Sequence, residues 1–338
     1  MRIALDAMGG DFAPEATVAG ALMARRELGI EIALVGPAEL IESELKRHGE
    51  PPTGVQIIHA AQAIRMDEAP AQAVRQKREA SINVAMDLVR QGVADAVVSA
   101  GNTGAVMASA LMKLGRIHGI ERPAIGALIP YRTKVLVLDV GANADCKPSW
   151  LAQFGQMGSV FMEKVYGVRE PRVGLLNIGE EAGKGNELAT EAYERLKATP
   201  GVNFVGNIEG RDVHRGWVDV LVTDGFTGNV AVKVGEGVLE YAFGELRRVM
   251  TSTLRHKVAA LVLRNALLQL RREFDPNEYG GAPLLGVNGV VIIAHGRSDG
   301  AAIKNAVRQA RDAAASGMLD TLRSHLGAHR RFSIAAEL

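Results

Sequence analysis

The chain has 338 residues, of which 47% are hydrophobic and 23% charged, a profile typical of a globular protein with a large core. Its 39 basic and 38 acidic side chains give a formal net charge of +1, and aromatic residues make up only 4%, so neither bulk charge nor aromatic stacking favours nucleic-acid binding. The one cysteine, Cys146, excludes a disulfide within the chain and a zinc site built from cysteines.

Short apolar runs rich in Val, Ile and Leu alternate along the chain with amphipathic segments. The runs that we predict to be strands begin with "RIALDA" and "EIALVG", continue through "ADAVVSA" and "KVLVLDVG", and end with "VVIIAHG". Residues 80–91, 150–166 and 186–197 have the apolar spacing of helices. Nearly continuous apolar strands separated by helices predict an α/β fold, in which a mostly parallel sheet carries helices on both faces.

Residues from about 230 to 274 depart from this alternation, because they are helical in pattern and contain no strand run. We therefore expect a helical protrusion over about 235–274 within a single α/β catalytic unit of residues 1–327. Residues 328–338, "AHRRFSIAAEL", have no periodicity and are expected to fray.

Six predicted strands end in small polar loops. The carboxyl ends of parallel strands gather on one side of a sheet, where ligands bind. The loops read "DAMGGD", "SAGNTGA", "DVGANAD", "NIGEEAGKGNE", "TDGFTGN" and "AHGRSD". Glycines allow close approach to the backbone, and the free N–H groups at the start of the following helix attract anions. The loops predict a phosphate site, although Asn102 or Thr103 could instead simply cap a helix.

Two of these loops contain a lysine or a histidine that is a candidate for catalysis. Lys184 lies between two glycines just before a predicted helix, where it could meet a phosphate or a developing oxyanion; a solvated lysine is the alternative. His295 follows a buried strand and is as compatible with a structural role as with a catalytic one. Loop carboxylates could hold Mg²⁺, but capping and turn formation explain them as well, and we expect no metal and no other cofactor.

Nine segments, in this order, resemble the bacterial phosphate acyltransferases, which convert acyl-[acyl carrier protein] and orthophosphate into acyl phosphate. They span residues 3 to about 312 and include "ALDAMGGD", "SAGNTGA", "GLLNIGEEAGKGNE" and "YGGAPLLG". The resemblance implies a homodimer with a fold like the isocitrate and isopropylmalate dehydrogenases, shared with phosphotransacetylase. It also implies that the acyl phosphate passes to a glycerol-3-phosphate acyltransferase in phospholipid synthesis. Arg297 departs from the family, which more often has a small residue there.

Orthophosphate is already partly dianionic near neutral pH, so this reaction needs relief of charge repulsion more than it needs a base. We predict that Lys184 and Asn229, with His295 as a third, are the catalytic residues near the thioester carbonyl. We predict that phosphate and the acyl group are bound by residues of the strand-end loops: Gly9, Gly10, Asp11, Ser99, Gly101, Asn102, Thr103, Asp139, Asn143, Asn186 and Asp224.

Residues 251–272 contain basic side chains and no acid. Lys257, Arg264 and Arg271 recur every seven residues, which predicts one helical face. Together with Arg255 they predict docking to an anionic membrane or to the acidic carrier protein; a dimer-packing helix hairpin with a solvated basic face is the alternative. No signal-peptide pattern and no apolar stretch of ~18 residues is present, so we expect a cytoplasmic protein attached peripherally to the membrane.

Two other functions stay open on the sequence. A coenzyme A-dependent phosphotransacetylase would share the fold and the chemistry, but it needs an adenine pocket, for which the sequence gives no signal. A non-catalytic membrane-associated scaffold would need neither Lys184 nor the polar strand ends.

Overall fold

The structure is a computed structural model that describes residues 1–49, 53–131, 133–274 and 276–324; the tail at 328–338 lies outside them. The described strands are β1 (Arg2–Asp6), β2 (Glu31–Gly36), β3 (Val55–His59), β4 (Ala96–Ser99), β5 (Ala124–Pro130), β6 (Lys134–Leu138), β7 (Arg172–Asn177), β8 (Asn203–Glu209), β9 (Val220–Val222), β10 (Ala282–Leu285) and β11 (Val290–Ile293). The described α-helices are α1 (Glu15–Leu28), α2 (Ala38–Arg47), α3 (Pro70–Gln76), α4 (Ser81–Arg90), α5 (Thr103–Lys113), α6 (Pro148–Tyr166), α7 (Glu187–Ala198), α8 (Gly225–Met250), α9 (Leu254–Val262), α10 (Arg264–Glu273) and α11 (Gly300–Ala315).

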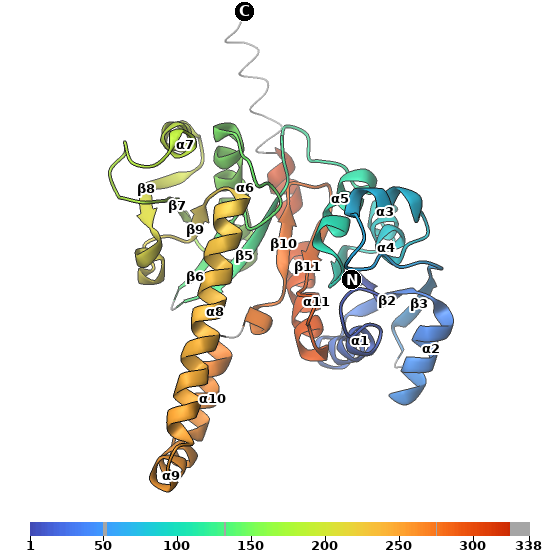
Figure 1. The fold of residues 1–338 in the computed structure, drawn as a ribbon. Helices are drawn as coiled ribbons and strands as arrows, with labels where there is room; N and C mark the ends of the chain where they lie inside the picture. The colour runs from blue at the N-terminus through green and yellow to red at the C-terminus, as the bar shows by residue number, and fades with distance from the viewer. Residues whose placement is uncertain (50–52, 132, 275, 325–338) are drawn as a thin grey trace, which may run out of the picture.

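These strands form one sheet in the order β3-β2-β1-β4-β11-β10-β5-β6-β9-β7-β8 (Figure 1). Neighbouring strands are parallel from β3 to β11 and again from β6 to β8. Antiparallel pairs between β11, β10, β5 and β6 join the two parallel parts. The prediction of a mostly parallel α/β sheet is confirmed.

Strand β1 shows why helices cover both faces of the sheet. Successive side chains of a strand point to opposite faces. Ile3 belongs to a core cluster with Val18 of α1 and Ile303 of α11. Ala4 belongs to a second cluster, which includes Met86 of α4. An apolar side chain is therefore buried on each face, as the continuous apolar run predicts.

Strand β10 was not among the predicted strands, because a proline has no N–H to donate and is normally confined to edge strands or bulges. Here Pro283 pairs with Ile292 of β11 on one side. The next residue, Leu284, pairs with Ile125 of β5 on the other side. The strand thus changes partner after the proline, so the ladder with β5 does not depend on the missing donor.

Helices α8, α9 and α10 project from the sheet (Figure 1). Helix α10 returns along α8, since the ring of Phe274, just after α10, has its centroid 6.2 Å from that of Phe243 in α8. We call α9, α10 and the part of α8 beyond residue 236 the helical arm. No residue of α9 or α10 is buried. Among the described helices, none combines the length and the apolar character that a membrane crossing requires.

The basic residues of the arm do not lie on one helical face, and that prediction is wrong. A seven-residue spacing keeps side chains on one face only along a continuous helix. Helix α9 ends before Leu263 and α10 begins after it. Lys257 therefore belongs to α9, with Arg255, whereas Arg264 and Arg271 belong to α10.

Candidate active site

A cleft of about 570 Å³ lies where the loops after β1, β4 and β11 face α5, α8 and the middle of the sheet. Its wall contains five of the predicted site residues: Asp11, Gly101, Thr103, Asn229 and His295. Much of the remaining wall is apolar and comes from Met66, Met107, Ile125, Ala127, Leu128, Val140, Val232 and Ile293. The cleft thus places polar strand ends beside an apolar surface.

The two glycine loops at one end of the cleft cross in contact with each other. A Cβ on Gly9 would lie 2.7 Å from the backbone nitrogen of Gly101, so only glycine fits at this crossing. Beneath it, the hydroxyl of Ser99 donates to Asp6 Oδ2 (2.7 Å) and accepts from Gly101 N–H (3.1 Å). Burial raises the pKa of Asp6, although hydrogen bonds from Ser81 and Ser99 oppose the shift. Ser99, predicted to bind substrate, is buried here and holds the loop in place.

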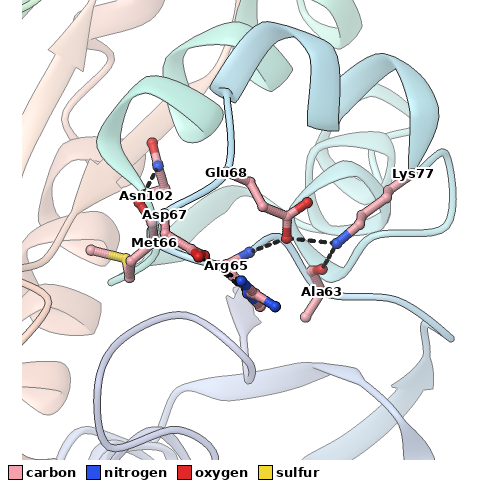
Figure 2. A network of polar contacts seen from close by, with 7 residues as sticks. All are labelled: Ala63, Arg65, Met66, Asp67, Glu68, Lys77 and Asn102. Carbon is pink, nitrogen blue, oxygen red and sulfur yellow. Dashed lines mark hydrogen bonds and ion pairs between the residues drawn. The ribbon is translucent and has the colours of Figure 1, made fainter.

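Asn102 has both ends of its side-chain amide bonded within the protein. Its Oδ1 accepts from Ala105 N–H (3.1 Å), which caps α5. Its Nδ2 donates to the carbonyl oxygen of Met66 (2.9 Å), as Figure 2 shows. The capping alternative for Asn102 is therefore realised. Thr103 differs, because its hydroxyl makes no hydrogen bond among the described residues and it lines the cleft.

Asp139 and Asn143 hold the loop after β6. Asp139 Oδ1 accepts from Ile125 N–H (2.9 Å), and its Oδ2 accepts from the backbone and side-chain nitrogens of Asn143 (2.7 and 3.0 Å). Asp139 is fully buried, and burial raises the pKa of its carboxyl group. A Cβ on Gly228 would lie 2.0 Å from the Asp139 carbonyl oxygen, so the first turn of α8 packs directly on this loop. Two predicted binding residues thus position the entry of α8.

His295 and Arg297 come from the loop after β11, which is fixed by Asp11 N–H donating to the Gly296 carbonyl (2.8 Å). His295 Nδ1 accepts from Arg297 N–H (3.1 Å). This bond leaves the proton of the neutral imidazole on Nε2, so His295 is a hydrogen-bond donor there. Arg297 lines the cleft, and its guanidinium makes no ion pair within the described chain. This loop therefore supplies a hydrogen-bond donor and a positive charge.

The first turns of α8 separate the cleft from a second cavity of about 330 Å³. Asn229 lines the cleft, whereas Asp224 and Thr227 line the second cavity, because residues two apart do not share a helix face. Asp224 caps α8 by accepting from Thr227 N–H (2.8 Å). Asn186, also at the second cavity, caps α7 in the same way through Ala189 N–H (2.9 Å).

Lys184 is exposed in the loop that borders this second cavity. Asn177 Nδ2 donates to its carbonyl oxygen (2.9 Å), and its side chain packs against Gly179. The structure does not bring Lys184 to the wall of the cleft that Asn229 and His295 line.

Glu180, Glu209 and Asp212 are the acids whose ligand atoms lie close enough for a metal ion, within 4.8 Å of one another in the described chain. Arg211 pairs with Glu209 (3.1 Å), and Arg215 pairs with Asp212 (2.9 Å). These ion pairs already balance much of the acidic charge, and the group lies outside both cavities.

Sequence reasoning missed several residues of the cleft wall, among them Met66, Met107, Lys233 and Tyr279. Met66 lies in a loop without periodicity, so no pattern marked it. Lys233 lies on the face of α8 that borders the cleft. In the sequence, its three-residue spacing from Glu236, with which it forms an ion pair (2.7 Å), is typical of an ordinary solvent-exposed helix surface.

Comparisons with known proteins place the chain among relatives of one kind. The family model described as "Fatty acid synthesis protein" matches residues 1–321. The chain is 49% identical to the phosphate acyltransferase of Gloeothece citriformis over 98% of this chain and 95% of that protein. It is 51% identical to the phosphate acyltransferase of Gloeobacter violaceus, over 96% of this chain and 97% of that protein.

Two solved structures share the fold at low sequence identity. A phosphotransacetylase from Streptococcus pyogenes superposes with a TM-score of 0.66 at 18% identity, over 93% of this chain and 94% of that one. A 4-hydroxythreonine-4-phosphate dehydrogenase from Klebsiella pneumoniae gives a TM-score of 0.59 at 14% identity, over 93% of this chain and 99% of that one. At these identities the likeness extends to the fold alone.

Proposed function

Because this chain belongs to the phosphate acyltransferase family, we propose that its cleft is where orthophosphate attacks an acyl thioester to give acyl phosphate. The protein is an acyltransferase of fatty acid and phospholipid synthesis. The observation that carries the assignment to the cleft is the joining of anion-binding groups to an apolar wall in one cavity. Phosphate needs the anion-binding groups, and an acyl chain needs the apolar wall.

In the reaction, a phosphate oxygen attacks the thioester carbonyl carbon and a tetrahedral oxyanion forms. The C–S bond then breaks, the acyl group stays on the phosphate oxygen, and the proton of hydrogen phosphate passes to the departing thiolate. Asn229 and His295 line the cleft and can donate hydrogen bonds to the oxyanion or to the thiolate. Asn229 uses one amide hydrogen on the Val140 carbonyl (2.8 Å), which leaves the other available.

The phosphate end of the cleft is the glycine crossing together with the loop after β11. Gly101 lines the cleft, and Gly9 and Gly10 pack closely against its loop, so we assign all three to the phosphate end, where the Thr103 hydroxyl is available to donate to the anion. Arg297 supplies the positive charge that an anionic nucleophile needs while negative charge grows on the carbonyl oxygen.

Lys184 stays our prediction for a second oxyanion contact. Its loop borders the second cavity, on the other side of the first turns of α8 from Asn229. For both residues to act on one carbonyl, this loop must approach the cleft when substrate binds. Kinetics of the Lys184 variant therefore decide whether the second cavity takes part in the reaction.

The proposal extends to the partners and to the arm. The thioester is carried by acyl carrier protein, and the acyl phosphate passes to a glycerol-3-phosphate acyltransferase. The exposed apolar residues Val230, Val234, Val238 and Tyr241 of α8 recur on one side of the helix and support a homodimer. Exposed leucine and valine side chains of α9, beside the basic residues of the arm, support peripheral contact with an anionic membrane from the cytoplasm.

The extent of the catalytic unit and its fold type are also part of the proposal. We assign the catalytic unit to residues 1–327, and the family resemblance implies a likeness to isocitrate and isopropylmalate dehydrogenases. Neither nucleotide nor metal is assigned a role.

The experiment is to incubate the purified protein with long-chain acyl carrier protein and orthophosphate, then trap acyl phosphate with hydroxylamine as the hydroxamate. We expect product that depends on both substrates and persists in EDTA. Failure to form hydroxamate would contradict the activity, and loss of activity in EDTA that Mg²⁺ restores would contradict the metal-free part. Coenzyme A thioester in place of the carrier tests the phosphotransacetylase alternative.

A further inference from the structure

Residues 61–69 form a strap that crosses from β3 to α3 beside the cleft. Met66, near the middle of the strap, lines the cleft and is 49% exposed. Its Cε would lie 3.3 Å from a Cβ built on Gly296. The Met66 side chain therefore reaches the loop that carries His295 and Arg297. It lies in the cleft wall between that loop and the start of α5.

The backbone at Met66 is fixed from the opposite side by Asn102. The Asn102 Nδ2 donates to the Met66 carbonyl (2.9 Å) while its Oδ1 caps α5 (Figure 2). Reversing the amide would place a donor against Ala105 N–H and an acceptor against the Met66 carbonyl, so only this orientation satisfies both contacts. A side chain predicted to hold phosphate thus links the phosphate loop to the strap.

The rest of the strap is held by a polar network centred on Lys77 (Figure 2). Lys77 Nζ donates to Glu68 Oε1 (2.6 Å) and to the Ala63 carbonyl (2.9 Å). Glu68 Oε1 also accepts from Arg65 N–H (2.9 Å). The hydrogen bond from Lys77, followed by that from Arg65 N–H, lowers the pKa of Glu68. The strap is therefore anchored on both sides of Met66.

We propose that Met66 is a specificity-determining residue for the acyl group and that Asn102 is the positioning residue that sets it. A thioether is flexible and polarizable, so it can adapt to an alkyl chain but offers little to phosphate. The surrounding wall, which includes Met107 and Leu128, has the same apolar character. This inference rests on the proposed function, because it requires that the cleft receives the acyl thioester.

The first test is the acyl-chain profile of Met66→Ala. We expect the ratio of kcat/KM for long-chain thioesters to kcat/KM for short-chain thioesters to fall by about 10-fold, which is the scale of lost contacts in an apolar pocket. The KM for phosphate should not change. The matched control is Met112→Ala, since Met112 is 51% exposed on α5 and does not line the cleft. Met66→Gln, which keeps the length but adds polarity, should lower kcat/KM for long chains in the same way.

The second test is Asn102→Ser, which keeps a capping oxygen for α5 but is too short to hold the Met66 carbonyl. We expect the chain profile to shift in the direction of Met66→Ala, with the melting temperature and the phosphate KM close to wild type. The double variant should be no further from wild type than Met66→Ala alone, because the two residues act as one unit.

Three results would overturn the inference. One is a Met66→Ala profile identical to that of Met112→Ala. Another is an Asn102→Ser variant with a raised phosphate KM and a wild-type chain profile, which would make Asn102 a phosphate ligand instead. The third is a double variant whose effects simply add. Failure of the proposed function is a separate outcome, because the wild-type protein would then form no acyl phosphate from any thioester.

Discussion

The cleft and the helical arm use their side chains in opposite ways. Around the cleft, polar groups such as Ser99, Asn102 and Asp139 are bonded within the chain, and the loops they hold are packed against the sheet. Along the arm, apolar side chains are left in solvent, with Tyr241 72% and Val262 80% exposed. Exposed apolar surfaces of this kind are typical of sites that bind another protein or a membrane. From this difference we propose that chemistry and docking belong to separate regions.

The largest effect should come from the proposed oxyanion donors. We expect Asn229→Ala and Lys184→Ala each to lower kcat by about 100- to 1000-fold, the scale of removing one oxyanion donor, with the fold intact. Liposome binding should be unaffected. Steady-state kinetics by hydroxylamine trapping, beside a sedimentation assay, would measure both. If only Asn229→Ala lowers kcat, the second cavity plays no part in the chemistry. A near-normal kcat in Asn229→Ala would contradict the assignment of the reaction to the cleft.

The next effect should appear in the arm. Replacing Lys257, Arg264 and Arg271 with Glu turns attraction to an anionic bilayer into repulsion, at roughly 1 kcal/mol per basic residue removed from the surface. We expect liposome affinity to fall by at least about 100-fold, and high salt to weaken the wild type in the same direction. If liposome affinity is unchanged but the KM for acyl carrier protein rises, the arm docks the carrier instead. No change in either would leave the arm as a packing element alone.

A smaller effect should follow from Arg297→Ser, which replaces the guanidinium with a small polar side chain. We expect the KM for phosphate to rise by about 10-fold with little change in kcat, because a ground-state charge contact is lost. Thr103→Val should raise the same KM. The carrier contains a second anionic group, its phosphopantetheine phosphodiester. A raised KM for carrier thioester, but not for a simple acyl thioester or for phosphate, would assign Arg297 to that group.

The smallest effect on activity should come from Cys146, half-buried below the first turn of α8. Burial first, and neighbouring carboxylates second, raise the pKa of this thiol from 9.0 to about 12. The thiolate is the reactive form, so alkylation at pH 8 should be about 1000-fold slower than for an ordinary cysteine and should accelerate up to pH 12. Cys146→Ser should keep wild-type kcat. A strong loss of activity would indicate an acyl-enzyme route through this thiol.

The mostly parallel character of the sheet could be predicted from the sequence because buried parallel strands are continuous apolar runs, as in β1 and β4, whereas the order of the strands could not. The strand β10 could not, since Pro283 removes the pattern that marks a central strand. The seven-residue spacing of basic residues failed because the sequence does not show that the helix breaks at Leu263.

The candidate site was predicted unevenly for a physical reason. Small polar residues serve equally as ligand contacts and as caps or loop anchors, so Thr103 and Asn102 could not be told apart before their hydrogen-bond partners were known. His295 and Asn229 belong to strand-end loops that the apolar runs mark, and both line the cleft. Met66 carries no such mark, because its place depends on Asn102 and on a strap held by Lys77.

The most direct test of the separation between cleft and arm is the rate of acyl phosphate formation from a soluble acyl thioester by the variant with Glu at positions 257, 264 and 271. The thioester needs neither membrane nor carrier, so only the cleft is assayed. We predict a kcat within about twofold of wild type, in a protein that no longer binds liposomes. A kcat reduced by about 10-fold or more, with the fold intact, would show that the arm takes part in catalysis and would contradict the account.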